Sequence, residues 1–378
     1  MQAQYQLWRR NLHQMPELSG QEWETSAYVN EILTNFQPDH HLKKLGGSGI
    51  LATFNGAEAG PHLLFRAELD GLPISEISDI PHRSQKAGKG HMCGHDGHMA
   101  ILLALGEQLS RKRPACGKVS LLFQPAEENG MGAKAVLEDA RFKALTIDAA
   151  FAIHNLPAFP LGKIVLKPGK FTANVKSVIL HFEGKSAHAA EPEFGLNPSE
   201  AMSRLHLDLL AQQQIDWKMP DFQLVTPIFQ SLGTKDYGIS AHHGELHYTI
   251  RTWDNDRMEE LAQKITVLHD HYCHQFGLVS RREWLQEFES NNNHPHLFEV
   301  VHQMALSSGM DFQQIDHPFK WGEDFGAFST HFPTMMIGLG AGENQPALHN
   351  PDYDFPDELI PIGSDLFGQI IQQFSTKA

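Results

Sequence analysis

The sequence predicts a two-domain α/β protein in which a mixed-sheet domain is interrupted by a smaller inserted α+β domain. Three observations predict this fold class. The chain has 378 residues, more than a single core usually organises. Short apolar runs alternate with helical patterns in both outer parts of the chain, which is typical of a covered sheet. The middle part has a different pattern of alternating strands and amphipathic helices.

The outer parts, residues 1–167 and 283–378, are expected to form one discontinuous domain. Residues 5–34 predict two helices, interrupted near Pro16, with Ser19 and Glu22 spaced like a capping box before the second helix. Further along, the apolar runs predict buried strands at 63–65, 119–123, 149–153 and 335–339, and the helical patterns predict helices at 99–109 and 132–137.

Residues 168–282 are expected to form the inserted α+β domain, with joints near Lys167 and Arg282. Alternation predicts strands at 176–182, 223–228 and 245–251, and helical periodicity predicts helices at 198–210 and 256–273.

Composition excludes several classes of protein. The formal net charge of −15 argues against a nucleic-acid or anionic-membrane partner, because phosphate groups are bound largely by basic patches. No apolar run approaches the roughly 20 residues that span a bilayer, and the first 14 residues have no signal-peptide pattern. The three cysteines cannot all pair in disulfides. We therefore expect a cytoplasmic protein.

Three of the predicted strands run directly into acidic or imidazole side chains. The first leads to Glu68 and Asp70, the second to Glu127 and Glu128, and the third to His154. Because ligands of open α/β sheets gather at the carboxyl ends of the strands, we expect these groups to share one edge of the sheet.

The densest group of metal-binding residue types lies in residues 90–98. Cys93 and His95 flank one glycine, so their side chains can converge on a dinuclear centre, and thiolate with imidazole suits zinc above all. Asp96 and His98 could orient the ligating imidazoles by hydrogen bonds. The alternative is a polar loop with an inert cysteine, but three histidines and a cysteine within nine residues favour the metal site.

Adjacent acids at a strand end usually mark a solvated turn, yet Glu127 and Glu128 follow Pro125 and an apolar strand. One of the two carboxylates can bridge two cations while the other stays free to take a proton from water. His349, after the glycine-rich turn 338–342, could supply a further imidazole, although alone it would be read as a surface histidine.

Six segments, in this order along the chain, resemble the hippuricase or amidohydrolase branch of the aminoacylase/carboxypeptidase metallopeptidase family. They are residues 13–19, 66–73, 91–98, 123–128, 154–157 and 349–355. That branch includes hippurate hydrolases, indoleacetyl-amino-acid hydrolases and N-acetyl-diaminopimelate deacetylases. The resemblance covers nearly the whole chain and implies a zinc-peptidase-like catalytic domain with an inserted lid and dimerisation domain.

The resemblance also implies the composition of the site. The implied metal ligands are Cys93, His95, Glu128, His154 and His349. They would hold two divalent ions, manganese or zinc, with cobalt and nickel as alternatives. Glu127 is the implied general acid and base, and Asp70 resembles a carboxylate that supports a metal-binding group. Glu68 stands where other branches place a metal-binding histidine, and we leave it out of the ligand set.

In the inserted domain, His188 lies in a motif, residues 184–190, whose histidine reaches the active site of the partner subunit in the family. The resemblance implies that His188 stabilises the tetrahedral oxyanion. It implies substrate binding by Asn197, in the following 195–198 motif, and by Arg251, which would otherwise be read as a solvated strand-end residue. Residues 234–243 depart from the family pattern, which bears on substrate preference.

These expectations combine into one hypothesis, a metal-dependent amidohydrolase of N-acyl amino acids such as N-acetyl or N-benzoyl derivatives. A metal-activated water would attack the amide, with Glu127 accepting its proton and returning it to the leaving amine. We expect a homodimer formed through the lid domain and a small N-acyl amino acid or short peptide as substrate. The alternatives are a dipeptidase or carboxypeptidase of the same family, a catalytically inactive binding protein, and a redox role for Cys93.

Overall fold

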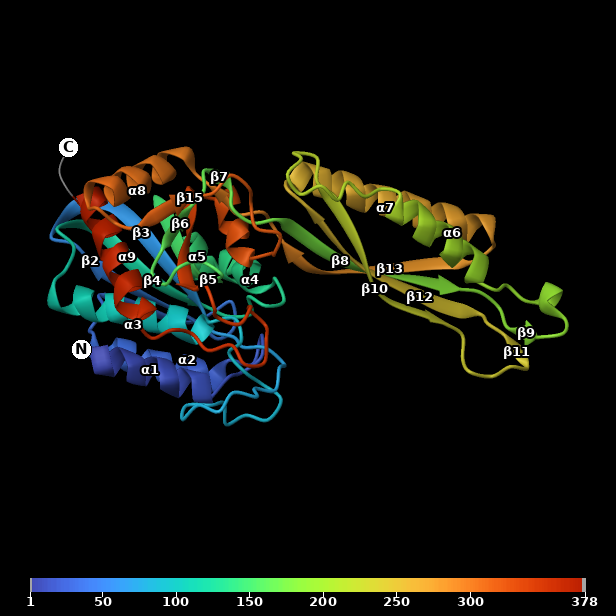
Figure 1. The fold of residues 1–378 in the computed structure, drawn as a ribbon, viewed down its shortest axis with the longest axis horizontal. Coiled ribbons are helices and arrows are strands. Elements are labelled where there is room, and N and C mark those ends of the chain that lie inside the picture. Colours follow the sequence, from blue (N-terminus) through green and yellow to red (C-terminus); the bar gives the residue numbers. More distant parts are fainter. Residues whose placement is uncertain (1, 376–378) are drawn as a thin grey trace. The chain divides into compact units, whose positions relative to one another are not determined.

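The computed structural model describes residues 2–375, which divide into two compact units (Figure 1). The first unit runs to Phe171 and adds Asn291–Asp316 and the chain from Glu323 onward. The second unit comprises Thr172–Ser290 and His317–Gly322. The expected joint near Arg282 therefore falls inside the second unit.

The first unit is built on an eight-stranded sheet. The sequence predicts that this sheet is mixed and predicts four of its strands. In order across the sheet, its strands are β1 (His40–Leu45), β2 (Gly49–Asn55), β4 (Cys116–Gln124), β3 (Glu58–Glu68), β5 (Ala149–Pro157), β16 (Thr334–Gly342), β6 (Ile164–Leu166) and β15 (Phe312–Gln314). The central strands β4, β3, β5 and β16 are parallel. Their carboxyl ends therefore share one edge of the sheet.

Helices cover the sheet of the first unit. They are α1 (Gln2–Gln14), α2 (Trp23–Asn35), α3 (His95–Arg111), α4 (Gly132–Glu138), α5 (Ala140–Lys143), α8 (Pro295–Ser307) and α9 (Leu359–Ser375), with the 3₁₀ helix η2 at Asp324–Thr330. The helices α1, α3, α8 and α9 pack into one core with the central strands. None of the described helices is long and apolar enough to cross a membrane.

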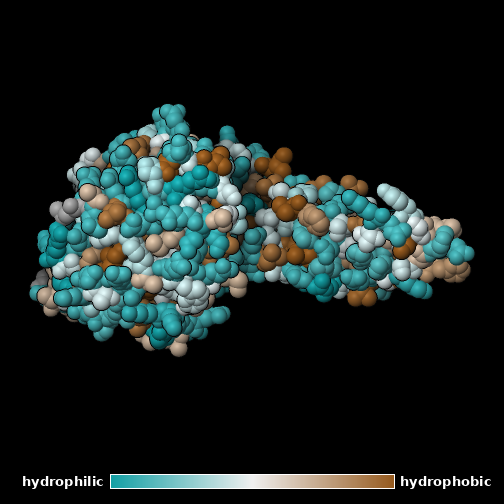
Figure 2. All heavy atoms as spheres, turned by 90° about the horizontal axis from the view of Figure 1, so that it is seen from below, coloured by the Kyte–Doolittle hydropathy of each residue, from teal (hydrophilic) through white to brown (hydrophobic). Residues whose placement is uncertain are grey.

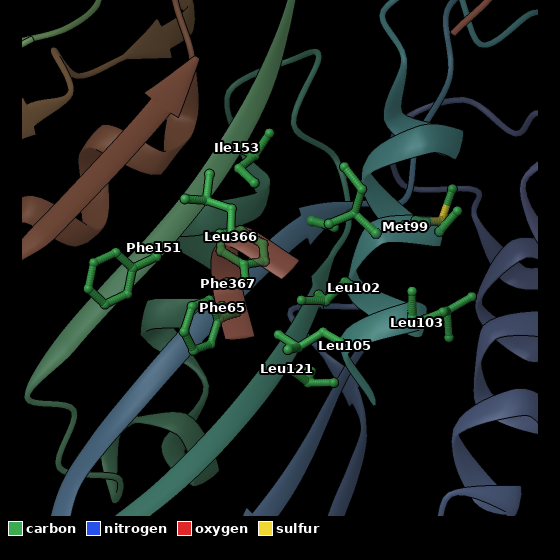
Figure 3. Close-up of a cluster of buried hydrophobic side chains, with 14 of the residues drawn as sticks. Phe65, Met99, Leu102, Leu103, Leu105, Leu121, Phe151, Ile153, Leu366 and Phe367 are labelled. Atoms are coloured by element: carbon green, nitrogen blue, oxygen red, sulfur yellow. The ribbon is translucent and has the colours of Figure 1, made fainter. Parts of the chain in front are cut away.

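Aromatic and leucine side chains fill this core (Figure 3). The ring of Phe65 on β3 lies 4.7 Å from Phe367 of α9 and 5.4 Å from Phe151 of β5, measured between ring centroids. Leu102 and Leu105 of α3 are buried in the same cluster. Each such fully buried side chain contributes about 1.5–3 kcal/mol relative to exposure, so the core fixes α3 against the sheet.

The capping box predicted before α2 is wrong. Glu22 occupies the N-cap position of α2, but its side chain makes no capping hydrogen bond. The backbone N–H of Thr25, in the first turn of α2, donates instead to Glu17 Oε2 at 2.8 Å. The side chains of Ser19 and Glu22 reach away from the helix, toward Asp70 and Ala126.

The second unit is an antiparallel sheet covered on one face by two helices. In order, its strands are β10 (Gln223–Leu232), β12 (His243–Thr252), β8 (Asn174–Glu183) and β13 (Val279–Phe288), and its helices are α6 (Ser199–Leu210) and α7 (Asn255–Gln275). Two short strands, β9 (Ala187–His188) and β11 (Ile239–Ser240), pair separately. The sequence did not predict β13, which pairs with β8 along one edge of the sheet.

Two more short strands, β7 (Gly169–Lys170) and β14 (Asn292–Asn293), pair with each other in the first unit, where the chain leaves for the second unit and returns from it. A single turn of 3₁₀ helix, η1 (Pro192–Phe194), follows β9 in the second unit.

Candidate metal centre

The strand ends bring the expected side chains to one place. His154 lies within β5, while Asp70 follows β3 and the pair Glu127 and Glu128 follows β4. His95 is the first residue of α3, which begins four residues earlier than the sequence predicts. Between the two candidate ligands of this segment, Gly94 has φ +95° and packs against Asn155, so that a Cβ would lie 2.6 Å from the Asn155 Oδ1 atom. Only glycine fits there.

Two overlapping groups of ligand atoms form around Cys93. Cys93, His95 and His154 offer one group, and Cys93, Glu128 and His349 offer another, with the ligand atoms of each group within 4.8 Å of one another. His349 follows β16, has φ +67°, and is held by a hydrogen bond from its N–H to the Met92 carbonyl at 2.8 Å. The five candidate ligands therefore gather although they come from distant parts of the sequence.

The distances between these ligand atoms fit shared cations. The Cys93 Sγ to His154 Nε2 distance is 3.7 Å, and Glu128 lies 3.8 Å from both His95 Nε2 and His349 Nε2. Donors that each lie about 2.0–2.3 Å from a tetrahedral zinc ion are about 3.3–3.8 Å apart. The spacing is too long for direct hydrogen bonds between nitrogen and oxygen and suits a cation between the atoms.

The two buried imidazoles of the site are oriented by backbone carbonyl groups. His95 Nδ1 donates to the carbonyl oxygen of Asp70 at 2.8 Å, and His154 Nδ1 donates to that of Asn155 at 2.9 Å. Each imidazole therefore turns its Nε2 toward the site, where this atom can bind a cation. His95 Nε2 and Glu128 Oε1 are buried without a hydrogen-bond partner among the described residues, as expected for atoms that bind a cation.

The pKa shifts of the buried acids, the thiol and His154 also bear on cation binding. Burial raises the pKa of Glu127 well above its usual range, and the neighbouring carboxylates of Glu323 and Glu128 add to the effect. Burial also raises the pKa of Glu128 to about 7 and that of the Cys93 thiol well above its usual value. Burial lowers the pKa of His154 to about 3. A divalent cation beside them would favour the ionised acids and the neutral imidazole, which are the ligating forms.

Asp96 and His98 do not play the part expected for them. Asp96 accepts hydrogen bonds from His13 Nδ1 at 2.8 Å and from Arg9 at 3.2 Å. His98 Nδ1 hydrogen bonds to Glu68 at 2.7 Å, and His98 Nε2 lies 2.6 Å from Asn155 Oδ1. Asp96 faces the N-terminal helix because His95 and Asp96, as consecutive residues of α3, point in different directions. His98 is occupied by Glu68, which also pairs with Arg66.

The sequence interpretation missed a buried ionic cluster beside Glu127. Arg66 of β3 is 1% exposed, and its guanidinium donates to Glu323 at 2.9 and 3.1 Å and to Asp324 at 2.6 Å. Oxygen atoms of Glu127, Glu323 and Asp324 lie within 4.8 Å of one another. The signal for such partners was a charged residue, Arg66, directly after the predicted buried strand 63–65, because a buried arginine requires carboxylates.

The residues expected to stabilise the oxyanion or to bind substrate lie in the second unit. His188 is exposed on β9, and its Nδ1 accepts a hydrogen bond from the N–H of Ala190 at 3.0 Å. Asn197 Nδ2 donates to Ser240 Oγ at 3.1 Å. Arg251 on β12 donates from Nε to the carbonyl oxygen of Lys320 at 2.9 Å. Ser240 belongs to the atypical 234–243 segment, which pairs with the His188 strand through β11.

Fold and ligand set together define a hydrolase built around divalent metal ions, and comparisons with known proteins agree. Residues 64–373 match the peptidase family M20/M25/M40. The chain is 31% identical to an N-acetyldiaminopimelate deacetylase of Oceanobacillus iheyensis, over 99% of this chain and 100% of that protein. It is 30% identical to an N-acetyl-L-cysteine deacetylase of Bacillus subtilis, over 93% and 83% of the two chains. This chain belongs to the peptidase family M20/M25/M40.

Solved structures agree with that membership. A Bacillus subtilis protein described as a dinuclear metal-binding peptidase of the M20 family superposes with a TM-score of 0.82, at 25% identity over 98% of this chain and 97% of that one. A putative aminohydrolase of methicillin-resistant Staphylococcus aureus has the same fold, with a TM-score of 0.88 at 24% identity over 99% and 97% of the chains. The resemblance predicted from the sequence motifs is confirmed.

Proposed function

We propose that this protein hydrolyses the amide bond of N-acyl amino acids with two divalent cations and Glu127 as general base. The observation that carries the proposal is the convergence of one thiol, three imidazoles and one carboxylate beside a second acid, Glu127, which we assign as the base. The proposed ligands are Cys93, His95, Glu128, His154 and His349. Both curated relatives named above are deacetylases of N-acetyl amino acids, which supports this substrate class.

The proposed mechanism assigns a proton shuttle to Glu127. When bound, the divalent cations lower the pKa of water and polarise the acyl carbonyl, a task that zinc, manganese, cobalt or nickel can perform. Glu127 accepts the proton of the attacking water and returns it to the leaving nitrogen, since an unprotonated amine leaves poorly. Its raised pKa suits a group that must both take and return a proton. His188 stabilises the oxyanion, while Asn197 and Arg251 bind the substrate.

Asp70 is proposed to fix the relative positions of these side chains. Its carboxylate accepts the backbone N–H groups of Glu127 and Glu128 at 3.1 and 2.9 Å, and its own carbonyl oxygen binds the ring of His95. One residue thus fixes the base, a carboxylate ligand and an imidazole ligand together. The catalytic contribution of Asp70 is therefore positional.

We also propose a homodimer formed through the second unit. The edge strand β10 exposes Ile228, Phe229 and Leu232, which are 60%, 51% and 42% exposed. Figure 2 shows hydrophobic residues scattered among hydrophilic ones on the surface. An exposed apolar edge strand is a template for pairing with another chain. Sedimentation of an Ile228→Glu, Phe229→Glu variant tests this: a monomer is expected, and an unchanged dimer contradicts the proposed interface.

We further propose a reducing, cytoplasmic location, which the free thiols of Cys93, Cys116 and Cys273 support.

The central experiment is a substrate panel with metal-loaded protein. N-acetyl and N-benzoyl amino acids, with dipeptides alongside, are assayed after loading with zinc, manganese, cobalt or nickel. We expect turnover of N-acyl amino acids and a loss of about 100-fold or more in Glu127→Gln at unchanged metal content. Turnover of dipeptides alone would reject the substrate class, and normal turnover by Glu127→Gln would reject the mechanism.

A further inference from the structure

The turn that carries Glu127 and Glu128 is held by two buried carboxylates. Three consecutive backbone N–H groups donate to them: that of Ala126 to Glu22 Oε1 at 2.9 Å, and those of Glu127 and Glu128 to Asp70 at 3.1 and 2.9 Å. Both acceptor side chains are fully buried. The position of both functional acids therefore depends on Glu22 as well as on Asp70.

Backbone conformation shows why such anchoring is needed. Ala126 has φ +52°, a left-handed conformation that is unfavourable for a residue with a Cβ atom. Four residues after Glu128, the turn packs so closely that a Cβ on Gly132 would lie 1.6 Å from the Pro125 carbonyl oxygen. A conformation of this kind persists only where surrounding contacts determine it. At the strained residue itself, the carbonyl oxygen of Ala126 accepts the N–H groups of Met131 and Gly132 at 3.3 and 3.0 Å, and its N–H donates to the side chain of Glu22.

Glu22 is in turn fixed from its own side. Its Oε1 also accepts the N–H of Gly20 at 2.7 Å, and its Oε2 accepts the hydroxyl of Ser48 at 2.9 Å. Ser19, three residues earlier, donates from Oγ to Asp70 Oδ2 at 2.7 Å. One short segment before α2 therefore contacts both carboxylates that hold the turn.

The helix does not require the Glu22 side chain. It makes no capping hydrogen bond at the start of α2, where Glu17 accepts from the backbone N–H and the hydroxyl of Thr25 instead. The buried carboxylate of Glu22 binds a distant turn and does not cap its own helix, so it departs from the capping-box pattern of the local sequence. Such departures concentrate at functional sites.

We propose that Glu22 is a positioning residue for catalysis, which acts through Ala126 to aim Glu127 and Glu128. The inference rests on the proposed function, since it takes Glu127 as the base and Glu128 as a ligand. Without the Glu22 carboxylate, the turn relaxes from the left-handed conformation at Ala126, and both acids move relative to His95 and Cys93. Residues that orient ligands in this way typically change activity or metal affinity about 10- to 100-fold when they are removed.

The experiment compares Glu22→Ala, Glu22→Gln and a matched control, Glu17→Ala, in the full-length protein. Two readouts are used: kcat on the best N-acyl amino acid, and the visible absorption spectrum and affinity of added Co²⁺. We expect Glu22→Ala to lower kcat about 10- to 100-fold and to shift the Co²⁺ spectrum. Glu17→Ala removes a carboxylate that caps α2, so it lowers the melting temperature and leaves both readouts unchanged.

Glu22→Gln is the rescuing variant. Its amide oxygen can still accept the N–H groups of Gly20 and Ala126, and its amide nitrogen can donate to the hydroxyl of Ser48, which is able to accept. We expect kcat and the Co²⁺ spectrum of Glu22→Gln to stay close to those of the wild type. If Glu22→Ala behaves like Glu17→Ala, with lower stability but normal kcat and an unchanged spectrum, the proposal is overturned.

Two further comparisons keep the result decisive. If Glu22→Ala is insoluble, Glu22→Asp takes its place, because the shorter side chain withdraws the carboxylate from Ala126 and keeps its charge. An unchanged spectrum and kcat in Glu22→Asp also overturn the proposal. A wild-type protein that binds Co²⁺ but turns over no N-acyl amino acid refutes the proposed function alone. In that case the Co²⁺ spectra of the Glu22 variants still decide whether Glu22 positions the turn.

Discussion

Replacing Arg66 with methionine is expected to destabilise the protein in a pH-dependent way. The guanidinium of Arg66 pairs with Glu68, Glu323 and Asp324, and all four side chains are at most 2% exposed. Removing one partner of a buried ionic cluster costs about 3–5 kcal/mol, because the remaining charges stay buried without compensation. With an m-value of about 3 kcal/mol/M, the urea midpoint falls by about 1–1.7 M.

The pH dependence identifies the cause. Burial already raises the pKa of Asp324 to about 7, and loss of the Arg66 cation raises it further. Although burial opposes it, Arg66 helps to hold the pKa of Glu68 well below its usual value, so this pKa also rises when Arg66 is removed. A carboxyl group whose pKa is higher in the folded state favours folding at low pH and loses that contribution as pH rises. The difference between wild type and Arg66→Met should therefore be smaller at pH 5 than at pH 8.

The measurement is urea unfolding of metal-free protein, followed by far-ultraviolet circular dichroism at both pH values. The control is Arg204→Met, since Arg204 is half exposed, pairs with Glu200 one helical turn away, and has its guanidinium 5.6 Å from the centroid of the Phe276 ring. That variant should change stability by about 1 kcal/mol or less. An equal loss at pH 5 and pH 8 in Arg66→Met would show that lost packing, rather than unpaired charge, accounts for the effect.

Three other outcomes are expected. Although burial opposes it, Asp96 raises the pKa of His13 to about 9. In the same urea assay, His13→Gln should therefore lower the free energy of unfolding by about 3 kcal/mol below pH 6.5, and by progressively less as the pH rises through 9. Gly132→Ala should abolish metal binding, measured by elemental analysis, because its Cβ would overlap the turn. In the control Gly20→Ala, the Cβ has open space, so the positive φ should lower the free energy of unfolding by only about 1–2 kcal/mol. Cys93 should resist iodoacetamide in metal-loaded protein, whereas rapid modification with the metal present would favour a redox role.

Much of the fold and the gathering of the site could be predicted because both follow from local rules. Apolar runs around Phe65, Leu122 and Ile153 gave the central strands, and parallel strands place the residues after them on one edge. The strand β13 escaped prediction because its charged residues lie at a sheet edge and form no buried face, as the alternation of exposed and half-buried residues shows.

The partners of buried charges could not be predicted in the same way. Ser19 and Glu22 fit the capping-box spacing, but tertiary contacts with Asp70 and Ala126 determine where their side chains lie. Arg66 and Glu323 are 257 positions apart, and no local pattern links them. Hydrogen-bond partners of this kind are set by the packed structure, whereas strands and helices are set largely by periodicity.

The way the chain leaves the first unit and returns to it bears on how the large sheet can assemble. Strands β5 and β16 are direct neighbours although the whole second unit separates them in sequence. At the ends of that insertion, Ser290 Oγ donates to the carbonyl oxygen of Thr172 at 2.7 Å, and Asn292 pairs with Lys170. Once the insertion has folded, its two ends lie side by side, so the insertion adds little to the entropy of bringing β5 and β16 together, which then depends on the first-unit segments between them. Sequence changes within the insertion can therefore accumulate with little effect on the folding of the metal-binding unit.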